Sequence, residues 1–251
     1  GGIEIISRSD APAGSGLGAS GALDVALVAG LARLREETYT PEELAELGYH
    51  VEANELSLLG GRQDQYAAAL GGFHFLSFGE EGVGVRRLAL SQQAVHDLER
   101  HTVLAYTGRS HFSSDTHARV WERYRRGETD VCTALDTLRD LCGNCAEALE
   151  GGDWRRLAEL VSRNWREQQK LDGTITTPRI REMESAAREA GAWGLKATGA
   201  GAGGCMVAIG PPDAANAIRE VFERLGAQVL DFTFSVVGVQ VIESEVDAPP
   251  G

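Results

Sequence analysis

The sequence predicts an α+β protein in which helices and strands are mixed along the chain. Leucine residues recur at helical spacing between residues 20 and 35. Residues 73–78 alternate as a half-buried strand does, and the region from residue 205 to 242 shows a strand–helix–strand–strand pattern. With 251 residues, 43% of them hydrophobic, the chain can form one large domain or two smaller ones.

Local signals place the elements of the first part of the chain. Thr40-Pro41-Glu42-Glu43 is a capping box with proline at the first helical position, so a helix begins there. In chain order we expect a strand over residues 3–7, a glycine-rich turn, helices over 20–35 and from Thr40 to about Leu56, a turn over 59–66, and a short helix ended by Gly71-Gly72.

The remaining elements follow from the same patterns. Thr177-Pro178 starts a helix that runs to Gly191. A domain boundary is expected near residues 95–100, which divides the chain into residues 1–97 and 98–251. The other expected elements are strands over 73–78, 83–90, 101–106, 205–209, 229–234 and 237–242, and helices over most of 114–169 and over 213–225.

Charge and composition exclude several classes of protein. The net charge of −13 argues against a nucleic-acid-binding surface, which needs clustered basic residues. No apolar run approaches the roughly 20 residues that span a bilayer. The four cysteines are too few and too unevenly placed for a disulfide framework, and the six histidines show no metal-ligand spacing. We therefore expect a cytoplasmic protein with no nucleic-acid or membrane partner.

The stretch Ala11–Ala22, APAGSGLGASGA, is suited to binding phosphate. Its glycines allow the backbone to approach an anion closely, and it opens into a helix whose first amides are unpaired. Gly16–Gly21 also fits the G-x-G-x-x-G pattern of a dinucleotide site, but a second capped helix follows instead of the strand that such a site requires. No Walker lysine follows, which excludes a P-loop enzyme. A tight turn without a ligand remains the alternative.

Two acidic residues follow this stretch at positions that suit phosphoryl transfer. Glu52 is expected late in the second helix and Asp64 in the turn after it, so both can reach one site. Phosphoryl transfer needs one carboxylate to hold Mg²⁺ and another near the acceptor hydroxyl. Acidic residues on a helix are more often simply solvated, so spacing alone leaves both interpretations open.

Taken together, these motifs resemble those of the GHMP kinase family, named after galactokinase and homoserine, mevalonate and phosphomevalonate kinases. Pro12-x-x-x-Gly-Leu-Gly-x-Ser20 is similar to the family's second motif. Lys196-Ala-Thr-Gly-Ala-Gly-Ala-Gly-Gly204 is similar to its third motif. The resemblance implies two α+β domains, an N-terminal domain like the second domain of ribosomal protein S5 and a ferredoxin-like C-terminal domain. A homodimer is a further expectation.

The resemblance also implies roles for individual residues. Ser20 and Glu52 would bind Mg²⁺, and Asp64 would orient or deprotonate the attacking hydroxyl. The residues that would bind ATP are Pro12, Gly14, Ser15, Gly16, Leu17, Gly18, Ala19 and Ser20 of the first stretch, and Gly199, Gly201 and Gly203 of the second.

The branch of the family that phosphorylates sugars at the anomeric hydroxyl is the most similar one. Gly60–Phe73, Trp165–Arg179 and Val229–Phe234 carry the resemblance to kinases acting on heptose 7-phosphate. An L-fucose-type kinase shares Gln63–Tyr66 and is the alternative acceptor class, and a non-catalytic sugar- or nucleotide-binding module is the other alternative. Arg8, Arg62, Arg109 and Lys170 are candidates to bind a sugar phosphate.

Two departures from the family pattern are visible. Ala19 and Gly21 replace residues that the family usually has at these positions, and both changes are mild. The family's first motif does not precede the second, and the chain begins at Gly1 without methionine. We therefore expect a fragment or processed product that has little or no activity by itself.

Overall fold

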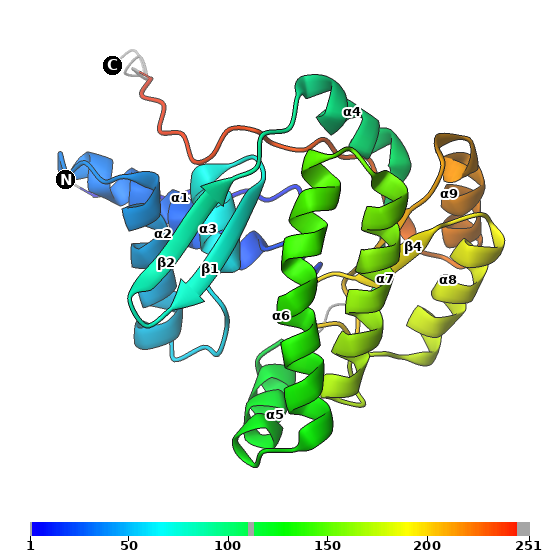
Figure 1. Ribbon diagram of the computed structural model, residues 1–251. Helices are drawn as coiled ribbons and strands as arrows, with labels where there is room; N and C mark the ends of the chain where they lie inside the picture. The colour runs from blue at the N-terminus through cyan, green and yellow to red at the C-terminus, as the bar shows by residue number, and fades with distance from the viewer. Residues whose placement is uncertain (1, 110–112, 245–251) are drawn as a thin grey trace.

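The first part of the chain builds a small layer of helices beside a two-stranded sheet. The computed structural model describes residues 2–109 and 113–244. Helices α1 (Ala19–Leu34), α2 (Pro41–His50) and α3 (Gln63–Leu70) pack around a core that includes Val25 and Tyr66. Strands β1 (His74–Gly79) and β2 (Gly82–Arg87) form an antiparallel hairpin. Figure 1 shows this hairpin lying across the helices.

A four-stranded antiparallel sheet organises the second part. It contains β3 (Thr102–Tyr106), β4 (Gly194–Ala197), β5 (Cys205–Ile209) and β6 (Gln228–Leu230) in the order β4-β5-β3-β6. Because sequentially distant strands are neighbours and helices connect them, this is the split β-α-β arrangement of a ferredoxin-like fold. The expected α+β architecture is therefore confirmed.

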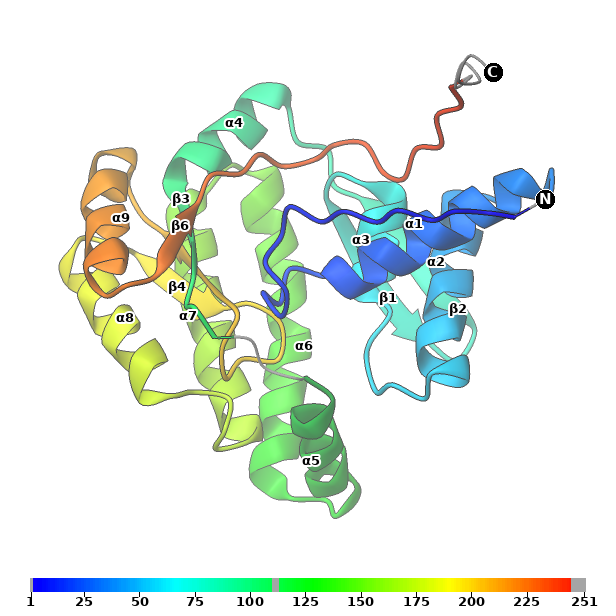
Figure 2. The ribbon, with the colours of Figure 1, turned by 180° about the vertical axis from the view of Figure 1, so that it is seen from behind.

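Helices cover this sheet and enclose the larger core. Long helices α6 and α7 run side by side in Figure 1, and α8 and α9 pack together beside them (Figures 1 and 2). Trp165, Met183 and Phe222 are completely buried between these helices and the strands. The helices of this part are α4 (Gln92–His101), α5 (Ser113–Arg125), α6 (Thr129–Glu150), α7 (Trp154–Leu171), α8 (Pro178–Glu189), the 3₁₀ turn Pro212–Ala214 and α9 (Ala215–Arg224).

Helix starts match their sequence signals closely. The Thr40 hydroxyl accepts a hydrogen bond from the Glu43 amide, and the Glu43 side chain accepts one from the Thr40 amide, which confirms the capping box. The Thr177 hydroxyl caps α8 by accepting a hydrogen bond from the Ile180 amide (3.2 Å), and Pro178 occupies the first turn. Residues 97 and 98 lie within α4, and the division of the chain at this point stays a prediction. Among the described residues, no helix combines the length and apolar character needed to cross a membrane.

Four expected strands are wrong or too long. Residues 3–7 and 237–242 are not strands, 229–234 shortens to β6, and 83–90 ends at Arg87 in β2. A strand requires a ladder of hydrogen bonds to a neighbour, which apolar alternation alone does not supply. The Val239 amide instead donates a single bond to the Ala69 carbonyl at the end of α3 (3.2 Å). In Figure 2 the first and last described segments run past α1 and α3 without joining a sheet.

Two glycine-rich loops interlock where the two parts of the molecule meet. The Ser15 carbonyl accepts hydrogen bonds from the Cys205 amide (2.8 Å) and the Thr198 hydroxyl (2.8 Å). Gly16 has a φ of 70°, and a Cβ there would lie 2.9 Å from the Thr198 carbonyl oxygen. A Cβ at Gly204 would lie 2.6 Å from the Ser15 carbonyl oxygen. The backbones of the two loops therefore approach so closely at Gly16 and Gly204 that a Cβ atom would not fit at either position.

We expect Gly16→Ala to lower the free energy of unfolding by about 1–2 kcal/mol from the left-handed backbone alone, with a further penalty from the contact with Thr198. Gly30→Ala is the matched control, because a Cβ at that position in α1 meets nothing within 4 Å. It should raise the free energy of unfolding by up to about 1 kcal/mol through helix propensity. Chemical denaturation of the two variants measures both effects. Equal free energies of unfolding for Gly16→Ala and Gly30→Ala would contradict the close contact between the two loops at Gly16.

Candidate active site

A cavity of about 330 Å³ lies between the two interlocked loops. Two of the predicted binding residues do not line it. The Pro12 carbonyl accepts the Ser15 amide within its own loop (3.1 Å), and the Leu17 side chain is 39% exposed. The predicted residues that line the cavity are Gly14, Ser15, Gly16, Gly18, Ala19, Ser20, Glu52, Asp64, Gly199, Gly201 and Gly203.

The N-terminus of α1 opens into this cavity without a capping side chain. Gly18 occupies the N-cap position with a φ of 74°, and the first turn contains no acidic residue. The Ser15 hydroxyl is buried and has no hydrogen-bond partner. Unpaired amides, a favourable helix dipole and a free hydroxyl together form a site for an anion.

Ser20 and Glu52 form a polar pair at the edge of the cavity. The Ser20 hydroxyl donates to the Glu52 carboxylate at 3.1 Å, and the Gln65 amide donates to the other carboxylate oxygen at 2.5 Å. Glu52 lies in a π-helical turn, Val51–Glu55, that continues α2. Single π turns occur frequently at functional sites. Gly48, one turn earlier, brings α2 close to α1, so Glu52 on the same face reaches Ser20.

Asp24 adds a second carboxylate next to this pair. It lies one helical turn after Ser20, and one of its carboxylate oxygens is buried without a partner. Burial raises the pKa of Asp24, and the nearby Glu52 carboxylate raises it further. The fully buried Gln65 side chain, which donates to Glu52, acts on the pKa of Asp24 in the opposite direction.

Asp64 lies in the first turn of α3 and not in the preceding turn, which corrects the expectation from sequence. Its side chain lies directly against Gly18 and Gly21, where added Cβ atoms would come within 3.2 Å and 3.0 Å of it. Burial raises the pKa of Asp64, and the Glu52 carboxylate raises it further. The carboxyl group is therefore a stronger base than an exposed aspartate, and it sits beside the start of α1.

His117 is a member of the site that the sequence does not reveal. It comes from α5, lines the same cavity, and interacts electrostatically with Asp64. Burial lowers the pKa of His117, while the Asp64 carboxylate acts in the opposite direction. No spacing in the sequence marks this histidine, because its proximity to Asp64 arises only from the tertiary fold.

The second glycine-rich loop forms the opposite wall. The Gln168 side chain donates to the Gly199 carbonyl at 2.8 Å, and the Ala202 amide donates to the Ile175 carbonyl at 2.6 Å. Ala202 has a φ of 63°, an uncommon conformation for a residue with a side chain. The loop is therefore held from α7 and from the segment after it.

The basic residues suggested for binding a sugar phosphate do not line the cavity. Arg62 binds Glu46 (3.0 Å) and stacks on Tyr49, and Lys170 binds Glu167 (2.7 Å). Arg8 pairs with Asp10 on the surface (3.3 Å). Arg109 contributes its carbonyl to the Gly204 amide. Lys196, at the start of the second glycine motif, is buried against Asn164 (2.8 Å).

The oxygen ligands at the cavity edge suit Mg²⁺. Within the described ranges, no group of three His, Cys, Asp or Glu residues is arranged to hold a metal ion alone. Mg²⁺ is commonly bound through one or two carboxylates together with substrate phosphates and water. The Ser20 hydroxyl and the Glu52 carboxylate, 3.1 Å apart and next to the anion-binding helix start, fit that requirement.

Sequence comparison gives matches at both ends of the chain. The model of the GHMP kinases N terminal domain matches residues 1–72, and that of the GHMP kinases C terminal region matches residues 145–228. A D-glycero-alpha-D-manno-heptose 7-phosphate kinase of Campylobacter jejuni is 31% identical, covering 92% of this chain and 68% of the relative. A mevalonate kinase of Thermococcus sibiricus is also 31% identical, covering 84% of this chain and 60% of that protein.

Solved structures agree with the sequence matches. A D-glycero-D-manno-heptose 1-phosphate kinase from Bacteriodes thetaiotaomicron superposes with a TM-score of 0.73 at 25% identity, covering 93% of this chain and 66% of that one. A sugar kinase from Campylobacter jejuni gives a TM-score of 0.72 at 29% identity, and the match covers 92% of this chain and 66% of that one. The chain thus spans 60–68% of the length of these relatives. Both glycine-rich loops, the fold and these matches agree, and the chain belongs to the GHMP kinase family.

Proposed function

We propose that the protein is an ATP-dependent kinase that transfers the γ-phosphoryl group to the anomeric hydroxyl of a sugar. The observation that carries this proposal is the placement of Ser20, Glu52 and Asp64 around one anion-binding helix start. Phosphoryl transfer depends mainly on positioning and on neutralising charge, and these groups supply both. Free cysteines and the use of ATP support a cytoplasmic location. The expected homodimer stays a prediction.

Each group has a distinct part in this reaction. The free amides at the start of α1 and the Ser15 hydroxyl would bind phosphate oxygens. Ser20 and Glu52 would hold Mg²⁺, which neutralises phosphate charge when bound. Asp64 would accept the proton of the acceptor hydroxyl as the hydroxyl oxygen bonds to the γ-phosphorus and the bond to the β-phosphate oxygen breaks.

Heptose 7-phosphate is the acceptor that we propose first. The Campylobacter relative with that name is 31% identical over 92% of the chain. Both of the solved structures named above are sugar kinases. L-Fucose is the alternative sugar, and a truncated binding module without activity is the alternative from another class.

A substrate screen tests this function. The protein is incubated with ATP, Mg²⁺ and either heptose 7-phosphate, L-fucose or mevalonate, and ADP release is measured together with phosphorus NMR of the product. Turnover with heptose 7-phosphate and a phosphate on the anomeric carbon is the expected result. Turnover with mevalonate alone would reject a sugar acceptor. ATP binding without turnover on any acceptor would favour the binding module.

Asp64→Asn should reduce kcat by at least about 100-fold, because general-base catalysis typically contributes a factor of 10²–10⁴. The amide keeps the size of the side chain, so the dissociation constant for an ATP analogue should hardly change. Asp213→Asn, an exposed substitution on the 3₁₀ turn, is the matched control and should leave kcat unchanged. Loss of ATP binding in Asp64→Asn would mean that this residue has a different role.

The same substitution should increase stability near neutral pH. Because the folded state raises the pKa of Asp64, ionising this carboxyl group disfavours folding at any pH above its folded pKa. The amide removes that penalty, so the free energy of unfolding of Asp64→Asn should exceed that of the parent at pH 7. The difference should vanish as the pH falls below the ordinary aspartate range. Denaturation curves at several pH values measure this effect, and a destabilised variant would contradict it.

Glu52→Gln should weaken the dependence of nucleotide binding on Mg²⁺. The amide keeps its contact with Ser20 but removes the charge that would bind the cation. Calorimetric titration of an ATP analogue with and without Mg²⁺ should show a clear gain in affinity with Mg²⁺ for the parent and a much smaller gain for the variant. Glu55→Gln, at the end of the same π turn, is the control. Identical Mg²⁺ dependence in the parent and Glu52→Gln would exclude Glu52 as a ligand.

A further inference from the structure

A second cavity, of about 710 Å³, lies between α5, α6 and the end of α7. Its volume falls within the roughly 300–1,000 Å³ that is usual for small-molecule sites. Val120 and Trp121 form its α5 wall, Leu135 its α6 wall, and Leu171 and Ile175 its base at the end of α7. None of the residues that we assign above to ATP or Mg²⁺ lines it.

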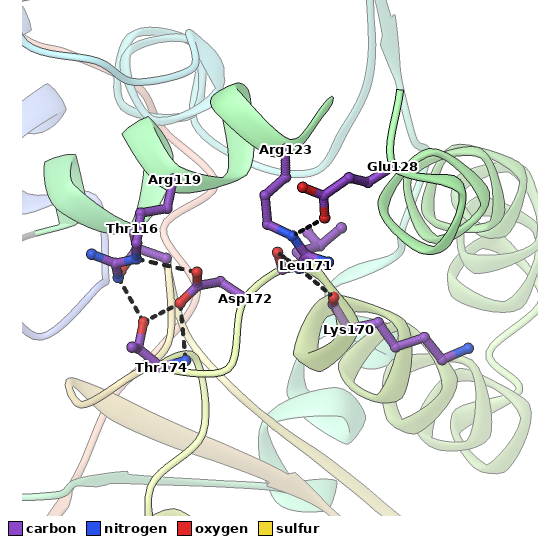
Figure 3. Close-up of polar contacts among 8 residues, drawn as sticks. All are labelled: Thr116, Arg119, Arg123, Glu128, Lys170, Leu171, Asp172 and Thr174. Carbon is purple, nitrogen blue, oxygen red and sulfur yellow. Dashed lines mark hydrogen bonds and ion pairs between the residues drawn. The ribbon is translucent and has the colours of Figure 1, made fainter. Parts of the chain in front are cut away.

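Polar contacts hold the α5 wall in place together with the packing of Val120 against the core. Figure 3 shows Arg119 and Arg123 reaching from α5 to the segment at the end of α7. Arg119 Nε donates to the Asp172 carboxylate at 3.1 Å, and Arg123 donates to the Leu171 carbonyl at 2.7 Å. Arg123 also pairs with Glu128 at 2.6 Å. These contacts tie α5 to the end of α7, while Trp121 on the same helix stays half exposed beside the cavity.

Asp172 keeps its charge in this arrangement. Burial alone would raise its pKa, but hydrogen bonds from Thr174 and Arg119 hold the pKa of Asp172 below its usual value. Asp172 therefore stays charged at neutral pH and pairs with Arg119 at 3.1 Å, which links α5 to the segment after α7.

The cavity adjoins the smaller cavity between the glycine-rich loops. His117 and Ala200 line both cavities, and Gln168, which holds Gly199, lines the larger one. His117 interacts with Asp64, so the boundary between the cavities lies next to the proposed base. A ligand in the larger cavity can therefore present a hydroxyl group to Asp64 while ATP occupies the smaller one.

The lining identifies the chemistry of that ligand. The Trp121 side chain is 50% exposed and offers a flat apolar surface for the C–H face of a sugar ring. Asp136, Arg139 and Gln168 offer planar donors and acceptors for hydroxyl groups. Arg139 is already paired with Asp136 (3.0 Å) and Asp140 (3.3 Å), so this corner does not favour a phosphate.

We infer that this cavity binds the acceptor sugar, with the ring against Trp121 and the reacting hydroxyl directed past His117 toward Asp64. The inference rests on the proposed function for the identity of the acceptor as a sugar. It assigns the uncharged, hydroxylated part of the sugar to the cavity and makes Trp121 a specificity-determining residue. It also makes His117 a residue that positions the reacting hydroxyl.

The test compares Trp121→Ala and Trp121→Phe in steady-state kinetics with heptose 7-phosphate. Trp121→Ala should raise the KM for the sugar at least tenfold and leave the KM for ATP unchanged, and Trp121→Phe should restore most of the affinity. Tyr39→Ala, which removes an exposed aromatic ring outside the cavity, is the control. A rise in the KM for ATP instead would mean that the cavity binds the nucleotide base.

A binding measurement separates this inference from the proposed function. Of the four tryptophans, only Trp121 lines this cavity, while Trp154, Trp165 and Trp193 pack in the hydrophobic clusters. Tryptophan fluorescence should therefore respond to a sugar in the cavity chiefly through Trp121. Heptose 7-phosphate and L-fucose are titrated without ATP, and quenching that disappears in Trp121→Phe supports the sugar site even if no turnover occurs. Turnover with heptose 7-phosphate that is unaffected in Trp121→Ala would overturn the inference and leave the proposed function intact. Absence of both quenching and turnover with sugars would overturn both.

Discussion

The Ser15 carbonyl is the contact on which the arrangement of the site depends. It accepts the Cys205 amide and the Thr198 hydroxyl, and so joins the loop before α1 to the loop between β4 and β5. Those loops belong to different parts of the chain with separate hydrophobic cores. One short backbone contact therefore sets the distance between the start of α1 and the second glycine-rich loop. The glycines are required because the two backbones meet with no room for a Cβ.

Charge is the second constraint, and it opposes folding. Asp24, Glu52 and Asp64 lie close together, and the burial and mutual repulsion that raise the pKa of Asp24 and Asp64 disfavour their charged forms. No lysine or arginine is among the described residues that line the cavity between the two glycine-rich loops. The chain offsets the unfavourable charge of these carboxylates only in part, through the side-chain amide of Gln65 and the backbone amides at the start of α1. A ligand that brings a cation together with an anion complements both the carboxylates and the amides at the start of α1. Its binding should therefore also stabilise the fold.

Sequence patterns predict the parts of this structure that local physics determines. The Thr40 capping box, the helix start at Thr177 and the glycine-rich turns depend on neighbouring residues, and all form as expected. Residues 3–7 and 237–242 show why alternation is insufficient, because a strand needs a partner that local sequence does not specify. Spacing and family resemblance select Ser20, Glu52 and Asp64 as candidates, and the fold brings all three to one cavity. His117 is not among these candidates, because only the path of α5 across the cavity brings it to Asp64.

The difference between what local sequence determines and what the tertiary fold determines also applies to α5. Its helical pattern is clear from sequence, but its position depends on Arg119 and Arg123, which contact Asp172 and the Leu171 carbonyl more than 40 residues away. Arginines are abundant on this helix and look like ordinary surface residues in the sequence. Val120 packs partly against the core, whereas Trp121 stays half exposed beside the larger cavity. The arginine contacts tie the helix to the end of α7, and His117 on the same helix lines both cavities.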